Sequence, residues 1–146
     1  MLKKFITLLL IFSSIQLHSK QGELSVTWYG TTNILISDGT QSILFDPFFT
    51  RPSLLEVIFF RKLEAKKENI TKWISNEELK KIKAIFISHT HYDHVLDLEN
   101  IQSLTSANVY GSSSVKNILP PDQSKKSLTE IKINQKIQVG PFTLTT

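Results

Sequence analysis

Four residues of the kinds that bind metal ions lie close together in one short stretch of the sequence. Residues 84–94 read Ala-Ile-Phe-Ile-Ser-His-Thr-His-Tyr-Asp-His, which places His89, His91, Asp93 and His94 within six positions. Imidazole nitrogens and a carboxylate oxygen are ligands that suit a borderline-soft divalent ion such as Zn²⁺. A single histidine beside a strand is usually packed or solvated, but this combination favours a metal site.

The spacing of these residues divides them into two pairs. Side chains two positions apart in extended backbone point the same way, so His89 and His91 can hold one ion together. Asp93 and His94 stand at the start of a helical stripe of apolar residues, Val95, Leu98, Ile101 and Leu104. The turn into that helix can aim both at a second ion, and paired ions form a recurrent hydrolytic device. The alternative for Asp93 is a simple helix N-cap.

The elements that position these residues can be predicted from the flanking sequence. Residues 84–87 form an unbroken apolar run, typical of a buried strand. Upstream, alternating residues predict a half-buried strand over 24–30, and Asp38-Gly39 predicts a hairpin turn between strands at 33–37 and 42–46. Asn76 is expected to cap a short helix over 76–81. Downstream we expect a helix over 112–119, stopped by Pro120-Pro121, and strands over 108–111, 128–133, 136–139 and 142–145.

The stretch from His89 to His94 matches the pattern His-x-His-x-Asp-His, and on it the chain resembles the metallo-β-lactamase superfamily. The earlier stretch Leu44-Phe45-Asp46-Pro47-Phe48-Phe49 looks like that superfamily's aspartate motif. Its Asp-Pro-Phe-Phe form is similar to the branch that contains phosphodiesterase-like and lactonase-like hydrolases. The resemblance implies an α+β fold, the αβ/βα sandwich of the superfamily. It also implies that Asp46 hydrogen-bonds the histidine loop and holds it in shape, where the alternative is an ordinary Asp-Pro turn.

The resemblance implies a metal-dependent hydrolase that uses a metal-bound hydroxide on an ester, lactone or phosphodiester of a small-molecule substrate. His89 and His91 would hold the first metal, and Asp93 and His94 the second, with Asp93 also managing a proton in catalysis. Zinc is favoured because di-iron relatives tend to carry a glutamate at the place of His91, while manganese and iron stay open.

The family's remaining ligands lie downstream: a third histidine, a bridging aspartate and a final histidine. This sequence has no histidine after His94, so we expect only about the N-terminal half of the sandwich within residues 20–146. The alternative to a hydrolase is a truncated, non-catalytic metal-binding or interaction remnant.

Residues 1–19 are set apart from the expected domain. Lys3 and Lys4 precede an apolar run over 5–15, the layout of a secretory signal peptide. The run is shorter than the roughly 20 apolar residues of a spanning helix, although an uncleaved anchor is the alternative. We therefore expect an exported protein, periplasmic or secreted.

Composition narrows the possible partners and ligands. The chain has no cysteine, which excludes disulfides and thiolate ligands and argues against the lactamase subclass with a cysteine at its second metal. Removal of Lys3 and Lys4 lowers the formal net charge from +4 to +2. The basic residues are scattered among acids, so the sequence gives no case for nucleic-acid binding.

Residues 47–63 are too apolar for a bare loop. Because a dense apolar run is more often buried, we expect a helix from about Ser53 that packs in the core. The alternative is a flap beside the metals that contacts an apolar substrate or a membrane surface. Basic residues near anionic groups would support that second role: Arg51, Arg61, Lys62, Lys66 and Lys67.

Overall fold

The computed structural model describes residues 22–59 and 62–146. The predicted signal peptide over 1–19, and with it the export prediction, lies outside these residues, as do Phe60 and Arg61. Within them, no helix combines the length and the apolar character that crossing a bilayer requires.

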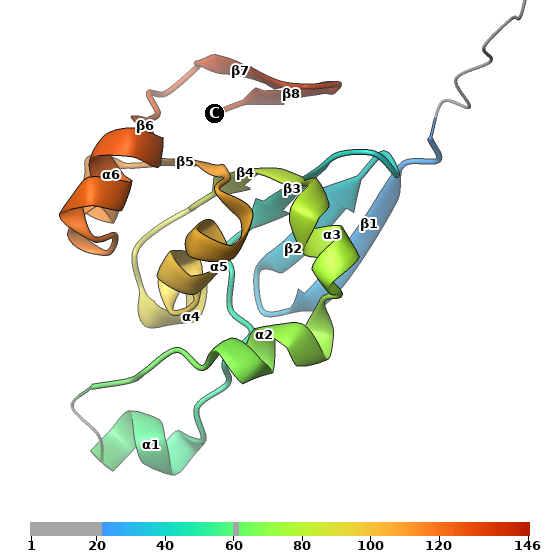
Figure 1. The fold of residues 1–146 in the computed structure, drawn as a ribbon. Coiled ribbons are helices and arrows are strands. Elements are labelled where there is room, and N and C mark those ends of the chain that lie inside the picture. The colour runs from blue at the N-terminus through green and yellow to red at the C-terminus, as the bar shows by residue number, and fades with distance from the viewer. Residues whose placement is uncertain (1–21, 60–61) are drawn as a thin grey trace, which may run out of the picture.

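A six-stranded mixed sheet forms the centre of the molecule, with strand order β1-β2-β3-β4-β5-β6 (Figure 1). The first three strands pair antiparallel and the last four pair parallel. The strands are β1 Ser25–Gly30, β2 Asn33–Ser37, β3 Ser42–Phe45, β4 Ile82–Phe86, β5 Asn108–Gly111 and β6 Leu128–Glu130. A separate hairpin is formed by β7 Lys136–Val139 and β8 Phe142–Thr145.

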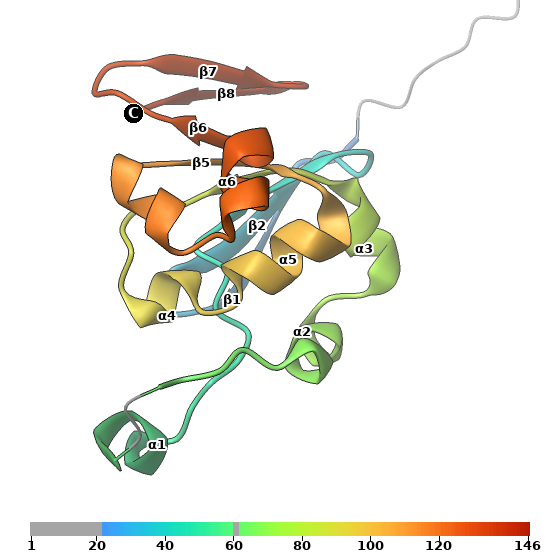
Figure 2. The same ribbon diagram turned by 60° about the vertical axis from the view of Figure 1, so that its left-hand side comes forward.

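Helices cover one face of this sheet and the β7–β8 hairpin lies over the other, as Figures 1 and 2 show from two directions. The elements between the strands are α1 Leu54–Phe59, α2 Lys67–Trp73, α3 Asn76–Lys81, α4 Tyr92–Val95, α5 Leu98–Thr105, the 3₁₀ helix Ser113–Asn117 and α6 Pro121–Ser127. This layered arrangement confirms the predicted α+β class and the metallo-β-lactamase-type sandwich.

The two faces of the sheet have separate apolar cores, because successive side chains of a strand point to opposite sides. On the helix side, Leu44 and Ile85 pack with Leu98 and Ile101 and further buried residues. On the hairpin side, Ile43, Ala84 and Phe86 pack under Ile137 and Val139. Strand β4 is thus covered on both faces, which explains its unbroken apolar run.

The prediction that one face of the first strand, β1, is buried is wrong for most of its length. Tyr29 is buried on the helix side, whereas Val26 and Trp28 are exposed. The reason is that β1 lies at the edge of the sheet, while the hairpin packs on β3, β4 and β5.

The turn at Asp38-Gly39 forms as predicted, whereas two helix ends differ from the prediction. In this turn, the Asp38 carboxylate accepts hydrogen bonds from the backbone of Thr40 and Gln41 at 2.8 and 2.7 Å. Ser75, not Asn76, caps α3 through a capping box with Glu78. Pro121 begins α6 rather than only ending a helix, because the first helical turn needs no N–H there.

The expectation that the helix in residues 47–63 packs in the core is also wrong. A helix does form from Leu54, but α1 has no buried residue. Phe48 and Phe49 before it are buried, so the burial stops where the chain leaves the sheet. The helix-side core is already filled by residues of α2, α3 and α5, and α1 projects away from the sheet (Figures 1 and 2).

Candidate metal centre

The predicted ligand residues lie at the carboxyl edge of the parallel strands. Strands β3 and β4 run in register, with Phe45 beside Phe86. The next residues are therefore neighbours, and the Asp46 backbone N–H donates to the Phe86 carbonyl at 3.0 Å. The loop after β4, which carries His89 and His91, thus begins beside Asp46. This edge is where open α/β sheets usually bind their ligands.

Three of the four predicted ligands converge on a common space. The ligand atoms of His89, His91 and Asp93 all lie within 4.8 Å of one another. His89 Nε2 and His91 Nδ1 are 3.2 Å apart, and both histidines are exposed to solvent. Two imidazole nitrogens and one carboxylate oxygen fit a divalent ion of the zinc type, and their exposure leaves coordination positions for water. That these residues bind a metal stays a prediction.

Asp93 lies inside the short helix α4 instead of capping it. The N-cap position belongs to His91, whose side chain makes no capping hydrogen bond. The N-cap interpretation of Asp93 is therefore wrong, and its carboxylate is free to face the two histidines.

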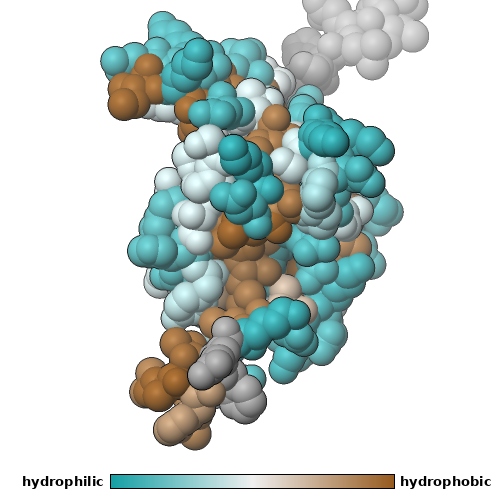
Figure 3. All heavy atoms as spheres, turned by 90° about the vertical axis from the view of Figure 1, so that its left-hand side faces the viewer, coloured by the Kyte–Doolittle hydropathy of each residue, from teal (hydrophilic) through white to brown (hydrophobic). Residues whose placement is uncertain are grey.

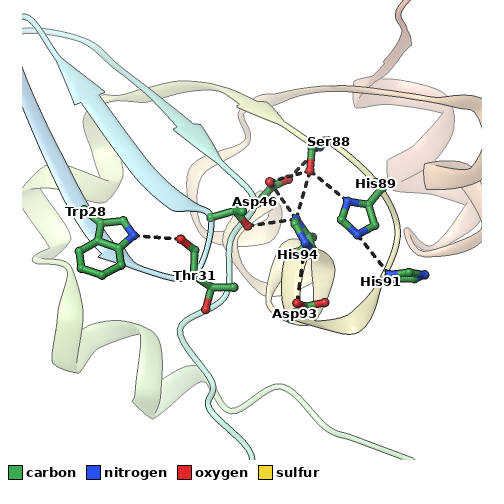
Figure 4. A network of polar contacts seen from close by, with 9 residues as sticks. Trp28, Thr31, Asp46, Ser88, His89, His91, Asp93 and His94 are labelled. Atoms are coloured by element: carbon green, nitrogen blue, oxygen red, sulfur yellow. Dashed lines mark hydrogen bonds and ion pairs between the residues drawn. The ribbon is translucent and has the colours of Figure 1, made fainter.

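His94 lies beside the group formed by His89, His91 and Asp93. Contacts to its Nδ1 nitrogen orient the ring. Its side chain is buried, and Nδ1 lies 2.9 Å from Asp46 Oδ2 (Figure 4). The hydroxyls of Thr32 and Ser88 lie 3.0 and 3.1 Å from the same nitrogen. With a proton on Nδ1 that donates to the Asp46 carboxylate, the Nε2 lone pair is free on the side of Asp93, whose Oδ2 is 3.8 Å away.

Asp46 makes the contacts that the family resemblance implied. Its carboxylate accepts from the Ser88 backbone N–H at 2.8 Å and from the Ser88 hydroxyl at 2.7 Å, in addition to the His94 contact. Its backbone has a φ of 43°, a left-handed conformation that a residue with a side chain rarely adopts, above all before a proline. Strain of this kind persists where surrounding contacts fix the residue, so Asp46 is more than an ordinary Asp-Pro turn.

Two residues that help to position His94, Thr32 and Ser88, were not predicted from the sequence. Thr32 lies in the two-residue turn between β1 and β2, and its hydroxyl contacts His94 across 62 residues of sequence. The Trp28 indole N–H steadies this turn by donating to the Thr31 carbonyl at 2.9 Å. No local pattern marks Thr32, whereas Ser88 could have been noted as a polar residue between the buried strand and the first histidine.

Asp97 is a third residue that the sequence reasoning missed. It is fully buried, and its Oδ2 accepts from the backbone N–H groups of Phe49 and Thr50, both at 2.7 Å. Its Oδ1 accepts from the Thr50 hydroxyl at 2.7 Å. Burial raises the pKa of the Asp97 carboxyl, although these hydrogen bonds work in the opposite direction. The signal was available, since Asp97 is a charged residue between the apolar Leu96 and Leu98. Its role is to fasten the loop after Asp46 to the segment that carries His94.

The family follows from a comparison with known domains. A model of the beta-lactamase superfamily domain matches residues 41–146, which is well over half of the chain. The chain belongs to the metallo-β-lactamase superfamily. The stretch matched includes Asp46 and the whole of the histidine motif. Among curated proteins compared by sequence, none matches this chain.

Three solved structures are similar to this chain in fold. A novel metallo hydrolase from the hyperthermophilic archaeon Ignicoccus hospitalis, Igni18, is 16% identical with a TM-score of 0.52, over 81% of this chain and 43% of that one. A metallo-β-lactamase from Cronobacter sakazakii is 20% identical with a TM-score of 0.57, over 82% and 48%. The chemotaxis sensor ODP, solved as a peroxy diiron species, is 24% identical with a TM-score of 0.50, over 80% and 44%.

These similarities show the fold of the chain. They do not show which reaction it catalyses, so a function has to be argued from the residues of the candidate site. All three structures are below 25% identity, and this chain spans somewhat less than half of the length of each. The superfamily branch suggested by the Asp-Pro-Phe-Phe stretch stays a prediction.

Proposed function

We propose that this chain forms the part of an exported, metal-dependent hydrolase that bears the first metal ligands. The substrate is a small molecule with an ester, lactone or phosphodiester bond. The observation that carries the proposal is the convergence of the ligand atoms of His89, His91 and Asp93 within 4.8 Å. Membership of the superfamily and the fold shared with a metallo hydrolase support it.

Each residue of the centre has a distinct role in this proposal. A bound divalent cation supplies Lewis acidity and lowers the pKa of a coordinated water to about 7. His89 and His91 hold the ion through neutral imidazole nitrogens. His94 presents Nε2 as a further ligand because Asp46 holds the proton on Nδ1. Asp93 supplies the carboxylate ligand of the group, and its Oδ2, 3.8 Å from His94 Nε2, can also take a proton from the attacking water and pass it to the leaving group.

The donor chemistry favours zinc as the metal. Two imidazoles and a carboxylate, with no cysteine in the chain, form a set that zinc accepts readily. The solved ODP structure carries a diiron species on a similar fold, so iron is the second metal to test. Manganese is the third.

The experiment is a metal and activity analysis of the protein expressed from its complete reading frame. Wild-type protein should contain a divalent metal by elemental analysis, and His89→Ala combined with His91→Ala should lose most of it. Asp122→Ala is the matched control, because Asp122 is an exposed acid in the first turn of α6, outside the cluster. Ester, lactone and phosphodiester substrates should be hydrolysed only by the proteins that retain the metal.

Two outcomes contradict different parts of the proposal. Undiminished metal content in the double variant would show that the metal site lies elsewhere. Metal bound at these residues without hydrolysis of any substrate class would instead favour the non-catalytic metal-binding alternative.

A further inference from the structure

Helix α1 presents its apolar side chains to solvent. Leu54, Leu55, Ile58 and Phe59 are 73, 64, 61 and 73% exposed. Figure 3 shows this helix as an apolar projection at one end of the molecule. Single exposed apolar residues are ordinary on a protein surface, but a gathered apolar patch marks a site of interaction.

Basic side chains border this projection. A hollow of about 370 Å³ next to α1 is lined by Arg51, Lys62 and Lys66, together with the acids Glu56 and Glu64. Lys62 lies 3.3 Å from Glu64, but both side chains are mostly exposed, so this pair is weak. Glu56 accepts a hydrogen bond from the Ser53 backbone N–H at 2.7 Å, which lowers the pKa of its carboxyl, as does the nearby charge of Lys66. Lys66 and the neighbouring Lys67 stay exposed, with no ion pair to any described residue.

We infer that α1 and the adjacent lysines form a docking surface for an anionic lipid bilayer. The surface, called the α1 surface below, consists of Leu54, Leu55, Ile58, Phe59, Lys62, Lys66 and Lys67. Its apolar side chains enter the boundary between head groups and acyl chains, and its lysines contact anionic head groups. Apolar residues beside bases are the combination by which short segments bind such interfaces.

The size of α1 favours a membrane over a protein partner. The helix has six residues, whereas a stable protein interface takes roughly 20 to 30 residues from each side. A bilayer makes no such demand, because each apolar side chain that enters it contributes independently. Charge complementarity with anionic head groups then selects the kind of lipid.

Docking through the α1 surface orients the candidate metal centre as well. Figures 1 and 2 both place α1 and α4 on the helix side of the sheet, opposite the β7–β8 hairpin. Because α4 carries Asp93, the candidate metal centre lies on the same side of the sheet as α1. The inference itself does not depend on catalysis, because its test measures binding.

The test is co-sedimentation with lipid vesicles, using protein from the complete reading frame. Vesicles of phosphatidylglycerol and phosphatidylcholine should bind the wild type, and vesicles of phosphatidylcholine alone should bind it far less. Leu55→Ser with Phe59→Ser should lower the partition coefficient about tenfold or more, since each buried methylene contributes to binding. Lys62→Glu with Lys66→Glu should lower binding to the anionic vesicles specifically and weaken its dependence on salt.

Ile133→Ser is the matched control, because Ile133 is 89% exposed and lies between β6 and β7. It should bind vesicles like the wild type. All variants should keep the wild-type melting temperature, since the changed side chains are exposed. Vesicle binding that the α1 changes leave intact, or equal binding to both lipid mixtures, would overturn the inference. Loss of a lipid-independent dimer in the Leu55/Phe59 variant would assign α1 to self-association instead.

Discussion

Asp46 and His94 are 48 residues apart in the sequence, yet Oδ2 of the first lies 2.9 Å from Nδ1 of the second, and both side chains are buried. A carboxylate at this distance favours a proton on Nδ1 of His94, which leaves Nε2 as the nitrogen that can bind a metal. The same carboxylate holds the Ser88 backbone at the start of the histidine loop. One residue therefore sets both the loop and the orientation of a candidate ligand.

Replacement of Asp46 should weaken metal binding without removing a ligand. Asp46→Asn preserves the shape and tolerates the left-handed backbone. Its NH₂ group only donates, so in the place of Oδ2 it cannot accept the hydrogen bonds of the Ser88 hydroxyl and His94 Nδ1. We expect a loss of about 10- to 100-fold in metal affinity, measured by competition with a chromophoric chelator. Asp122→Asn is the control. Unchanged affinity in Asp46→Asn would show that the carboxylate does not orient the site.

Asp97 should contribute to stability chiefly by satisfying donors of the loop after Asp46. Asp97→Ala leaves two backbone N–H groups and the Thr50 hydroxyl without their acceptor, and should destabilise by about 2–4 kcal/mol in urea unfolding. Asp97→Asn retains one carbonyl oxygen and should cost less. If Asp97→Ala and Asp97→Asn lowered the free energy of unfolding equally, loss of these hydrogen bonds would not be the cause of the destabilisation.

The raised pKa of Asp97 also predicts a pH dependence of stability. Burial makes the folded state hold the Asp97 proton more tightly than the unfolded state does. The contribution of this group is therefore fully present below its ordinary pKa of about 3.9 and is lost as pH rises through the raised value. The stability of the wild type relative to Asp97→Asn should fall as pH rises from about 4. A difference that grows with pH would contradict this.

Two phenylalanines of the same segment should respond differently to truncation. Phe49 is buried against Tyr29, with ring centroids 5.2 Å apart, whereas Phe59 on α1 is exposed. Phe49→Ala should destabilise by about 3–5 kcal/mol because it leaves a cavity in the core. Phe59→Ala should stay within about 0.5 kcal/mol of the wild type. Thermal and urea unfolding measure both, and a large loss in Phe59→Ala would mean that α1 packs on the domain.

Export predicts a processed N-terminus. Because Lys3 and Lys4 precede a short apolar run, protein recovered from its native host should begin near Lys20. Mass spectrometry of the intact protein measures this directly. Protein that keeps Met1 and fractionates with the membrane would instead establish an uncleaved anchor.

Sequence reasoning succeeded where the determinants are local. The apolar run before His89 and the stripe after Asp93 predicted β4 and α5, because strand and helix periodicity is written into neighbouring residues. The three convergent ligands were also named from their local spacing. It failed where the outcome depends on distant partners: Thr32 contacts His94 across 62 residues, and Asp97 contacts Phe49 across 48. The exposure of α1 was missed for the same reason, since apolar composition does not say whether a partner surface is available.

The parallel pairing of β3 with β4 makes the ligand geometry a late product of folding. Residues 84–105 carry all four candidate ligands, but Asp46 and Thr32 join them only after long stretches of chain have closed into loops. Contacts of such sequence separation form slowly, because loop closure must precede them. Early in folding, the histidines are therefore present without a fixed arrangement. If these residues bind a metal as proposed, the choice of metal depends on whether Asp46 docks before the ion is captured.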